Sequence, residues 1–120
     1  AYLKAMREIV APAADAFRPD IILVSAGFDT HWYDLALNVS YEGMSVMTEI
    51  IQAVAERHCD GRLVFVLEGG YNLEALSHGV HTVLRTLAGE RFPEPGAAGV
   101  AEVEAAARFH RNAFLDPDQE

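Results

Sequence analysis

The chain has 120 residues, of which 51% are hydrophobic, and this combination is typical of a single soluble globular unit. Its 18 acidic and 9 basic residues give a net charge of −9, which argues against nucleic-acid binding because phosphate contacts need clustered Lys and Arg. The sequence has no apolar run long enough to span a membrane. Its single cysteine, Cys59, excludes an intramolecular disulfide and favours a cytoplasmic location.

The first part of the chain predicts a helix followed by a buried strand. Residues 1–11 place their apolar side chains on one helical face, and Pro12 is expected to interrupt the helix before a further turn. Residues 21–24 form a short apolar run, rich in β-branched side chains, which Pro19 introduces. Because this run is continuous rather than alternating, it predicts a strand covered on both faces, as in a parallel sheet.

The middle of the chain predicts a crossover helix and a second strand. Ser40 is the expected N-cap of a helix that continues to about residue 58, and residues 63–67 form a second buried strand. A strand, a helix and a strand in this order predict a right-handed unit with two parallel strands. The expected apolar face of the crossover helix consists of Met44, Met47, Ile50, Ile51 and Val54.

The last part of the chain predicts a third helix that stops at Gly89. Residues 90–99 are expected to be a linker rich in Pro and Gly, and residues 100–120 a terminal helix and tail. The expected apolar face of the third helix consists of Leu73, Leu76, Val80, Val83, Leu84 and Leu87.

A polar loop follows each predicted strand, with the sequence GFDTH in the first loop and EGGYN in the second. Parallel strands end at the same sheet edge, so we expect Asp29 and Tyr71 to face one pocket, where Gly69 and Gly70 allow a ligand to approach. A metal-binding carboxylate and a hydroxyl donor indicate metal-assisted attack on a carbonyl compound. By residue type alone, ordinary turn and capping roles are the favoured interpretation.

The histidines do not complete a metal site on spacing alone. A catalytic zinc site normally has three protein ligands and an open position. His78 and His81 fall beside the polar side of the third helix, so solvent-exposed or interfacial positions are expected. His58 and His110 are expected to be structural or exposed.

The segments PDIILVSAGFDTHWYD and GRLVFVLEGGYNLEAL together resemble the C-terminal portion of the zinc-dependent histone deacetylase family. The resemblance covers residues 1–89 and is closest to the class II and bacterial branch, which contains acetylpolyamine amidohydrolases and acetoin-utilization proteins. It implies an α/β fold, with this chain as the C-terminal βαβα segment of a three-layer parallel-sheet architecture of the arginase and deacetylase type.

The resemblance also implies a reaction, the hydrolysis of an N-acetyl amide in acetyl-lysine or an acetylpolyamine. It implies that Asp29 is a ligand of Zn²⁺ and that Tyr71 donates a hydrogen bond to the oxyanion. Gly69 and Gly70 would border the channel for the acylated amine. For Glu68, a structural role is favoured over that of a general base. For the first loop, we expect His31 to orient it and Asp34 to anchor it through backbone bonds.

Two departures from the family pattern limit what this chain does alone. The loop after Asp34 is about two residues short, and neither the family's preceding Asp-x-His pair nor its His-His dyad occurs in the 120 residues. The chain alone is therefore expected to be inactive, as a fragment of a longer enzyme or with an N-terminal segment supplied by another chain. The alternative is a catalytically inactive truncated module that acts in partner binding or as a homo-oligomer.

Overall fold

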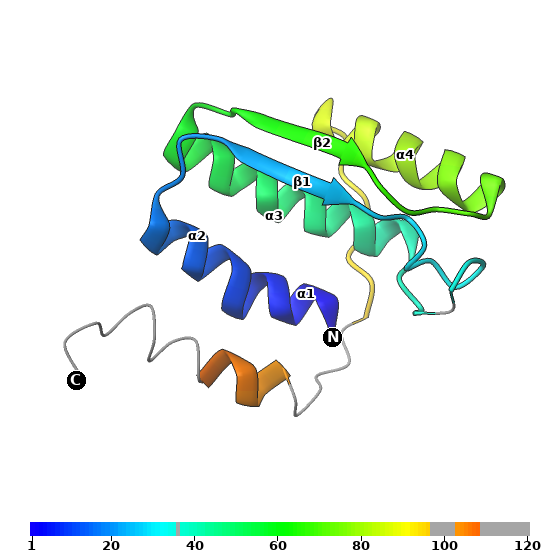
Figure 1. Cartoon of the computed structure of the whole chain (residues 1–120), viewed down its shortest axis with the longest axis horizontal. Coiled ribbons are helices and arrows are strands. Elements are labelled where there is room, and N and C mark those ends of the chain that lie inside the picture. The colour runs from blue at the N-terminus through cyan, green and yellow to red at the C-terminus, as the bar shows by residue number, and fades with distance from the viewer. Residues whose placement is uncertain (36, 97–102, 109–120) are drawn as a thin grey trace.

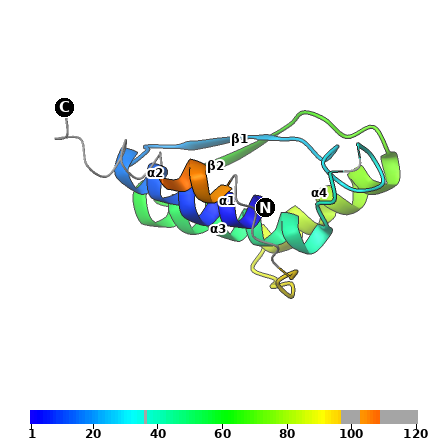
Figure 2. The same cartoon turned by 90° about the horizontal axis from the view of Figure 1, so that it is seen from below.

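The computed structural model describes residues 1–35, 37–96 and 103–108. A two-stranded parallel sheet lies against helices that cover one of its faces, as the two perpendicular views show (Figures 1 and 2). The elements in chain order are α1 (Tyr2–Ala5), a π-helical turn η1 (Met6–Val10), α2 (Ala11–Phe17), β1 (Ile22–Ala26), α3 (Tyr41–Cys59), β2 (Leu63–Leu67) and α4 (Leu73–Leu87).

The N-terminal helix runs through Pro12, so the expected interruption at this residue is wrong. Proline lacks an N–H group, and its ring crowds the carbonyl four residues earlier, here that of Glu8. The π-helical turn ends at Val10, two residues before Pro12, and widens the helix where an α-helix would break. The helix therefore continues as α2 to Phe17. It ends where Arg18 adopts a left-handed conformation with φ of 56°.

The sheet has the predicted βαβ topology. β1 and β2 pair in parallel, in a register that runs from Ile22 opposite Leu63 to Ala26 opposite Leu67. The crossover is α3, whose first turn is capped by Ser40 as predicted, since the hydroxyl oxygen accepts a hydrogen bond from the N–H of Gly43 at 3.2 Å.

One face of the sheet is uncovered by the described residues, whereas the sequence predicts strands covered on both faces. Leu23, Val64 and Val66 are 68%, 44% and 51% exposed, while the residue that precedes each of them is half-buried. All the labelled helices lie on the other side (Figure 2). The continuous apolar run is the pattern of a sheet between two layers, and the described residues supply only one of those layers.

The helix α4 packs through small residues rather than through its full row of leucines. Leu73 and Leu84 are 78% and 59% exposed, so the predicted apolar face is wrong at these two positions. Small side chains let α4 approach α3 closely, and the hydroxyls of Ser45 and Thr86 share a buried hydrogen bond of 2.8 Å between the helices. The buried residues of α4 are Ala75, Gly79, Thr82, Val83 and Thr86.

The end of α4 is as predicted. The last helical residue is Leu87, and Gly89 follows with φ of 97°, a conformation that suits glycine at a helix end. Beyond it, residues 103–108 are helical, and the rest of the predicted segment 100–120, including His110, lies outside the described residues. Within the described residues, no helix combines the length and apolar character needed to cross a membrane.

We expect Gly79→Ala to lower the free energy of unfolding by about 1 kcal/mol, even though alanine favours a helix by about 1 kcal/mol over glycine. A β-carbon at this position would lie 2.5 Å from Cδ1 of Phe28 and 3.3 Å from Sδ of Met44, both of which are buried. Urea denaturation measures the effect, with Ser77→Ala on the exposed side of α4 as the control. A Gly79→Ala protein at least as stable as the parent would show that Phe28 moves aside without cost.

Candidate active site

Two loops leave the sheet at the same end, one between β1 and α3 and the other between β2 and α4 (Figure 1). Parallel pairing continues past the strands, since the N–H of Glu68 donates to the carbonyl of Ala26 at 3.1 Å and that of Phe28 to the carbonyl of Gly69 at 2.8 Å. The topology therefore brings the two polar loops side by side, as the sequence predicts.

The Asp29 carboxylate lies against the backbone of Gly69. A β-carbon at Gly69 would be 2.7 Å from Cγ of Asp29 and closer still to Oδ2, so only glycine leaves room for this carboxylate. Tyr71 follows two residues later, with 75% of its surface exposed. The carboxylate and the residue that carries the hydroxyl thus stand on adjacent loops at one end of the sheet.

Asp34 joins the two loops directly. Its Oδ2 atom accepts hydrogen bonds from the N–H of Tyr71 at 2.6 Å and from the N–H of Asn72 at 2.8 Å. The expectation that Asp34 bonds to backbone amides is confirmed, but these amides belong to the neighbouring loop rather than to its own. The first loop closes on itself through the bond from the N–H of Leu35 to the carbonyl of Asp29 at 3.0 Å, and the Asp34 carboxylate reaches the amides of the adjacent loop.

Asn72 completes this connection and was not singled out from the sequence. Its side-chain amide donates to the carbonyl of Tyr33 at 3.2 Å, and its Oδ1 atom accepts from the N–H groups of Glu74 and Ala75 as the N-cap of α4. Asparagine directly before an apolar helical pattern is a recognised start signal, so the capping role was readable from the sequence. The bond to the other loop was not.

His31 is the buried centre of the first loop. It is 1% exposed, and its ring stacks on Tyr41 with 4.3 Å between the ring centroids. Its Nδ1 atom accepts a hydrogen bond from the N–H of Tyr33 at 3.3 Å. Burial lowers the pKa of His31, an effect that the carboxylates of Asp34 and Glu42 partly oppose, and this favours the neutral ring. Such a position fits the expected role of orienting the loop.

The described residues supply one candidate zinc ligand and not a complete site. No group of three or more His, Cys, Asp or Glu is arranged to hold a metal among them. His78 and His81 are exposed, and Nε2 of His58 bonds to Oδ1 of Asp15 at 2.8 Å, so these three residues have the exposed or structural positions expected. The carboxylate of Asp29 is a donor type that zinc accepts, but a catalytic site needs further ligands beside it.

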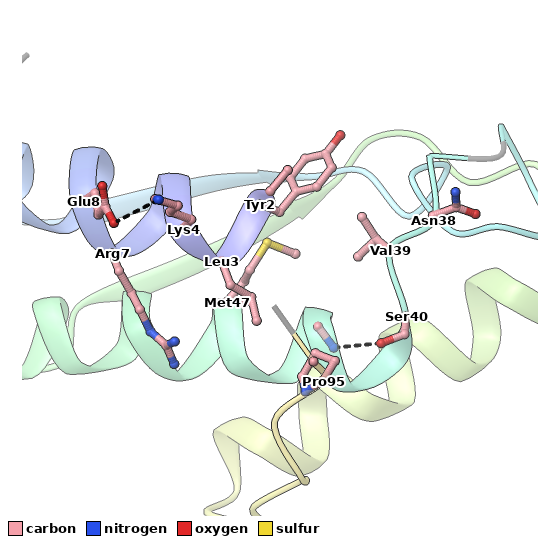
Figure 3. Close-up of a pocket in the computed structure, with 13 residues that line it drawn as sticks. Tyr2, Leu3, Lys4, Arg7, Glu8, Asn38, Val39, Ser40, Met47 and Pro95 are labelled. Atoms are coloured by element: carbon pink, nitrogen blue, oxygen red, sulfur yellow. Dashed lines mark hydrogen bonds and ion pairs between the residues drawn. The ribbon is translucent and has the colours of Figure 1, made fainter. Parts of the chain in front are cut away.

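Two cavities among the described residues lie away from Asp29 and Tyr71. An open cavity of about 390 Å³ is lined by α1, the end of the first loop, the start of α3 and the segment around Pro95, with Leu3, Val39 and Met47 on its walls (Figure 3). A second cavity of about 270 Å³ is apolar and lies between the N-terminal helix, β1 and α3. Neither has Asp29 or Tyr71 in its lining, so the expected pocket that these residues share is not one of them.

The sequence of this chain is similar to those of several histone deacetylases and related amidohydrolases. Histone deacetylase 10 of Oryza sativa subsp. japonica, a chloroplastic protein, is 46% identical over 98 residues, which are 76% of this chain and 22% of that protein. The histone deacetylase-like amidohydrolase of Pseudomonas aeruginosa is 43% identical over 74 residues, which are 60% of this chain and 20% of that protein. This chain thus spans about a fifth of the length of these relatives.

Solved structures agree with the sequence relatives. The HDA15 HD domain superposes with a TM-score of 0.76 at 31% identity, over 96% of this chain and 31% of that one. The histone deacetylase Clr3 superposes with a TM-score of 0.78 at 26% identity, over 92% of this chain and 18% of that one. These neighbours confirm the predicted α/β fold of the deacetylase type. Residues 1–87 match the family described as the histone deacetylase domain, and the chain belongs to this family.

Proposed function

We propose that this chain is the C-terminal part of a zinc-dependent deacetylase that hydrolyses N-acetyl amides, with acetyl-lysine or an acetylpolyamine as substrate. In this proposal residues 1–89 form the end of the catalytic domain, Asp29 is a zinc ligand and Tyr71 is a catalytic residue. The observation that carries it is the pairing of the two loops. The Asp29 carboxylate rests on Gly69, and Asp34 holds the backbone of Tyr71 next to it.

Each residue of the site has a defined task in this reaction. When bound, zinc supplies Lewis-acid polarisation of the acetyl carbonyl and a more acidic water. The hydroxyl of Tyr71 donates a hydrogen bond to the carbonyl oxygen as negative charge develops on it, and the exposure of this side chain leaves it accessible to substrate. Gly69 and Gly70 present backbone without side chains beside the acylated amine. Glu68 is exposed, and we assign it no proton transfer.

The remaining zinc ligands and the groups that transfer protons would come from outside this chain, in a longer polypeptide or a complementing N-terminal segment. The chain alone would therefore be inactive. We propose a cytoplasmic location, since Cys59 is the single cysteine and the chain therefore forms no intramolecular disulfide.

The test compares zinc content and hydrolysis of a fluorogenic acetyl-lysine substrate and of an acetylpolyamine. It uses this chain alone and the longest reading frame that contains it. We expect activity only in the longer protein, with loss of activity on treatment with a chelator and recovery on addition of zinc. A longer protein that binds no zinc and hydrolyses neither substrate would refute the proposed function.

The uncovered sheet face favours a second candidate function, a non-catalytic module that binds a partner or another copy of itself. Leu23, Val64 and Val66 present apolar side chains on this face, and an exposed apolar sheet surface promotes association. Concentration-dependent dimerisation of the longest reading frame without metal, measured by analytical ultracentrifugation, would support this function. A zinc-loaded, active monomer would exclude it.

A further inference from the structure

We infer that Asp34 is a positioning residue for Tyr71, because its carboxylate fixes the backbone that carries the Tyr71 hydroxyl next to Asp29. The inference rests on the proposed function, since it assigns a kinetic role within the same site. Asp34 would touch neither substrate nor zinc, and it would act entirely through the loop that follows β2.

A single oxygen atom of Asp34 makes both contacts. The bonds from the N–H groups of Tyr71 and Asn72 to Oδ2 measure 2.6 Å and 2.8 Å. Hydrogen bonds from an N–H to an ionised carboxylate are about twice as strong as those between neutral groups. The bonded residues are 37 and 38 positions apart along the chain, so these bonds hold together two loops that the sheet has brought to the same edge.

The loop that carries Tyr71 needs a restraint of this kind. Gly69 and Gly70 precede Tyr71, and Gly70 has φ of 141°, in a region that other residues rarely adopt. Glycine leaves a backbone more conformational freedom than any other residue. The Tyr71 side chain is mostly exposed and so gains little order from packing. The bond from the N–H of Tyr71 to the carboxylate of Asp34 restrains this backbone at Tyr71 itself.

The backbone of Asp34 is itself bonded to a buried residue of the first loop. Its N–H donates to the carbonyl of His31 at 2.9 Å, and His31 is buried and stacked on Tyr41. The side chain of Asn72 bonds back to the carbonyl of Tyr33, the residue before Asp34, at 3.2 Å. The contact between the loops is therefore made in both directions, from a side chain of each loop to the backbone of the other.

The expected effect is on the rate of the chemical step. Misplacement of a reacting group by about 1 Å costs roughly 10²-fold in rate, so we expect Asp34→Ala to lower kcat by roughly 10²-fold. KM and zinc content should change little, because Asp29 is retained. Asp34→Asn keeps a neutral oxygen acceptor and should cause a smaller loss.

The experiment uses the longest reading frame that contains this chain. Amide hydrogen exchange at Tyr71 and Asn72, zinc content, kcat and KM on the fluorogenic acetyl-lysine substrate are measured for Asp34→Ala and Asp34→Asn. The matched control is Asp20→Ala, which removes an exposed aspartate at the other end of β1. The double variant Asp34→Ala/Tyr71→Phe shows whether Asp34 acts through the Tyr71 hydroxyl.

We expect faster amide exchange at Tyr71 and Asn72 in both Asp34 variants, and no change in the control. Once the hydroxyl is gone, Asp34→Ala should lower kcat by no more than about twofold. Unchanged amide exchange at Tyr71 and Asn72 would overturn the contact between Asp34 and these residues. An equal loss of kcat with and without the Tyr71 hydroxyl would overturn action through Tyr71. A parallel loss of zinc would assign Asp34 a general structural role. An unsubstituted protein without deacetylase activity would overturn the proposed function and the kinetic role with it, whereas the exchange rates would still decide the contact.

Discussion

Asp29→Ala is expected to lose zinc binding and deacetylase activity together in the longest reading frame that contains this chain. A catalytic zinc site has three protein ligands, and removal of one leaves a pair that cannot define the site. Mutation of residues that hydrogen-bond to a metal ligand already lowers metal affinity by about 10- to 100-fold, so loss of the ligand itself should lower zinc affinity by more than this. Metal analysis after dialysis and the fluorogenic assay measure both effects, with Asp20→Ala as the control. An Asp29→Ala protein that retains stoichiometric zinc would contradict the assignment.

Gly69→Ala provides a second test that leaves the Asp29 carboxylate in place. Because Gly69 does not have a positive φ, alanine is compatible with the backbone itself, and the conflict is with the Asp29 carboxylate. The new methyl carbon would lie 2.7 Å from Cγ of Asp29 and closer still to Oδ2, so the carboxylate must move away from the second loop. We expect Gly69→Ala to lose zinc like Asp29→Ala, although all the acidic side chains are present. Full zinc content in this variant would show that the carboxylate binds metal from another position.

Tyr71→Phe is expected to lower kcat by about 10²- to 10³-fold without loss of zinc. The substitution removes only a hydroxyl, and loss of one donor to a developing oxyanion costs about 3 to 4 kcal/mol in the barrier. The ring is 75% exposed, so the free energy of unfolding should change little. Steady-state kinetics, metal analysis and thermal denaturation separate these effects.

The control for this prediction is Tyr33→Phe. Tyr33 lies in the neighbouring loop and is 65% exposed, so it tests for a general effect of losing an exposed tyrosine hydroxyl near the site. We expect this variant to retain kcat, because the proposed reaction assigns the Tyr33 hydroxyl no hydrogen bond to the oxyanion. Equal losses of kcat in the two variants would argue against a specific role for the Tyr71 hydroxyl.

The strands and the position of the two polar loops were predictable from the sequence, because they depend on patterns that are local in the chain. Two short apolar runs separated by an amphipathic helix define parallel strands, and parallel strands place their following loops at one edge. Ser40 before the crossover helix and Gly89 after the last helix marked boundaries that the structure confirms. The specific assignments of Asp29 and Tyr71 came from family resemblance, and they stay predictions.

The features that the sequence did not predict depend on contacts between distant segments. Pro12 was expected to break a helix because a π-helical turn has no simple sequence signal. The buried face of α4 was misjudged because Gly79 and Thr86, neither of them strongly apolar, pack where α3 comes close. Asp34 was assigned to its own loop because spacing along the chain does not reveal which backbone amides a carboxylate reaches across a sheet edge.

The crossover between the two strands determines when this site forms during folding. The bonds from Tyr71 and Asn72 to Asp34 span 37 and 38 residues, so their formation requires closure of a long loop through the whole of α3. During synthesis the first loop leaves the ribosome well before the second. The contact between the two loops cannot form until β2 has paired with β1. We therefore expect the arrangement around Asp29 and Tyr71 to form only after the two strands have paired. A change that slows strand pairing will delay the site even when it lies far from either residue.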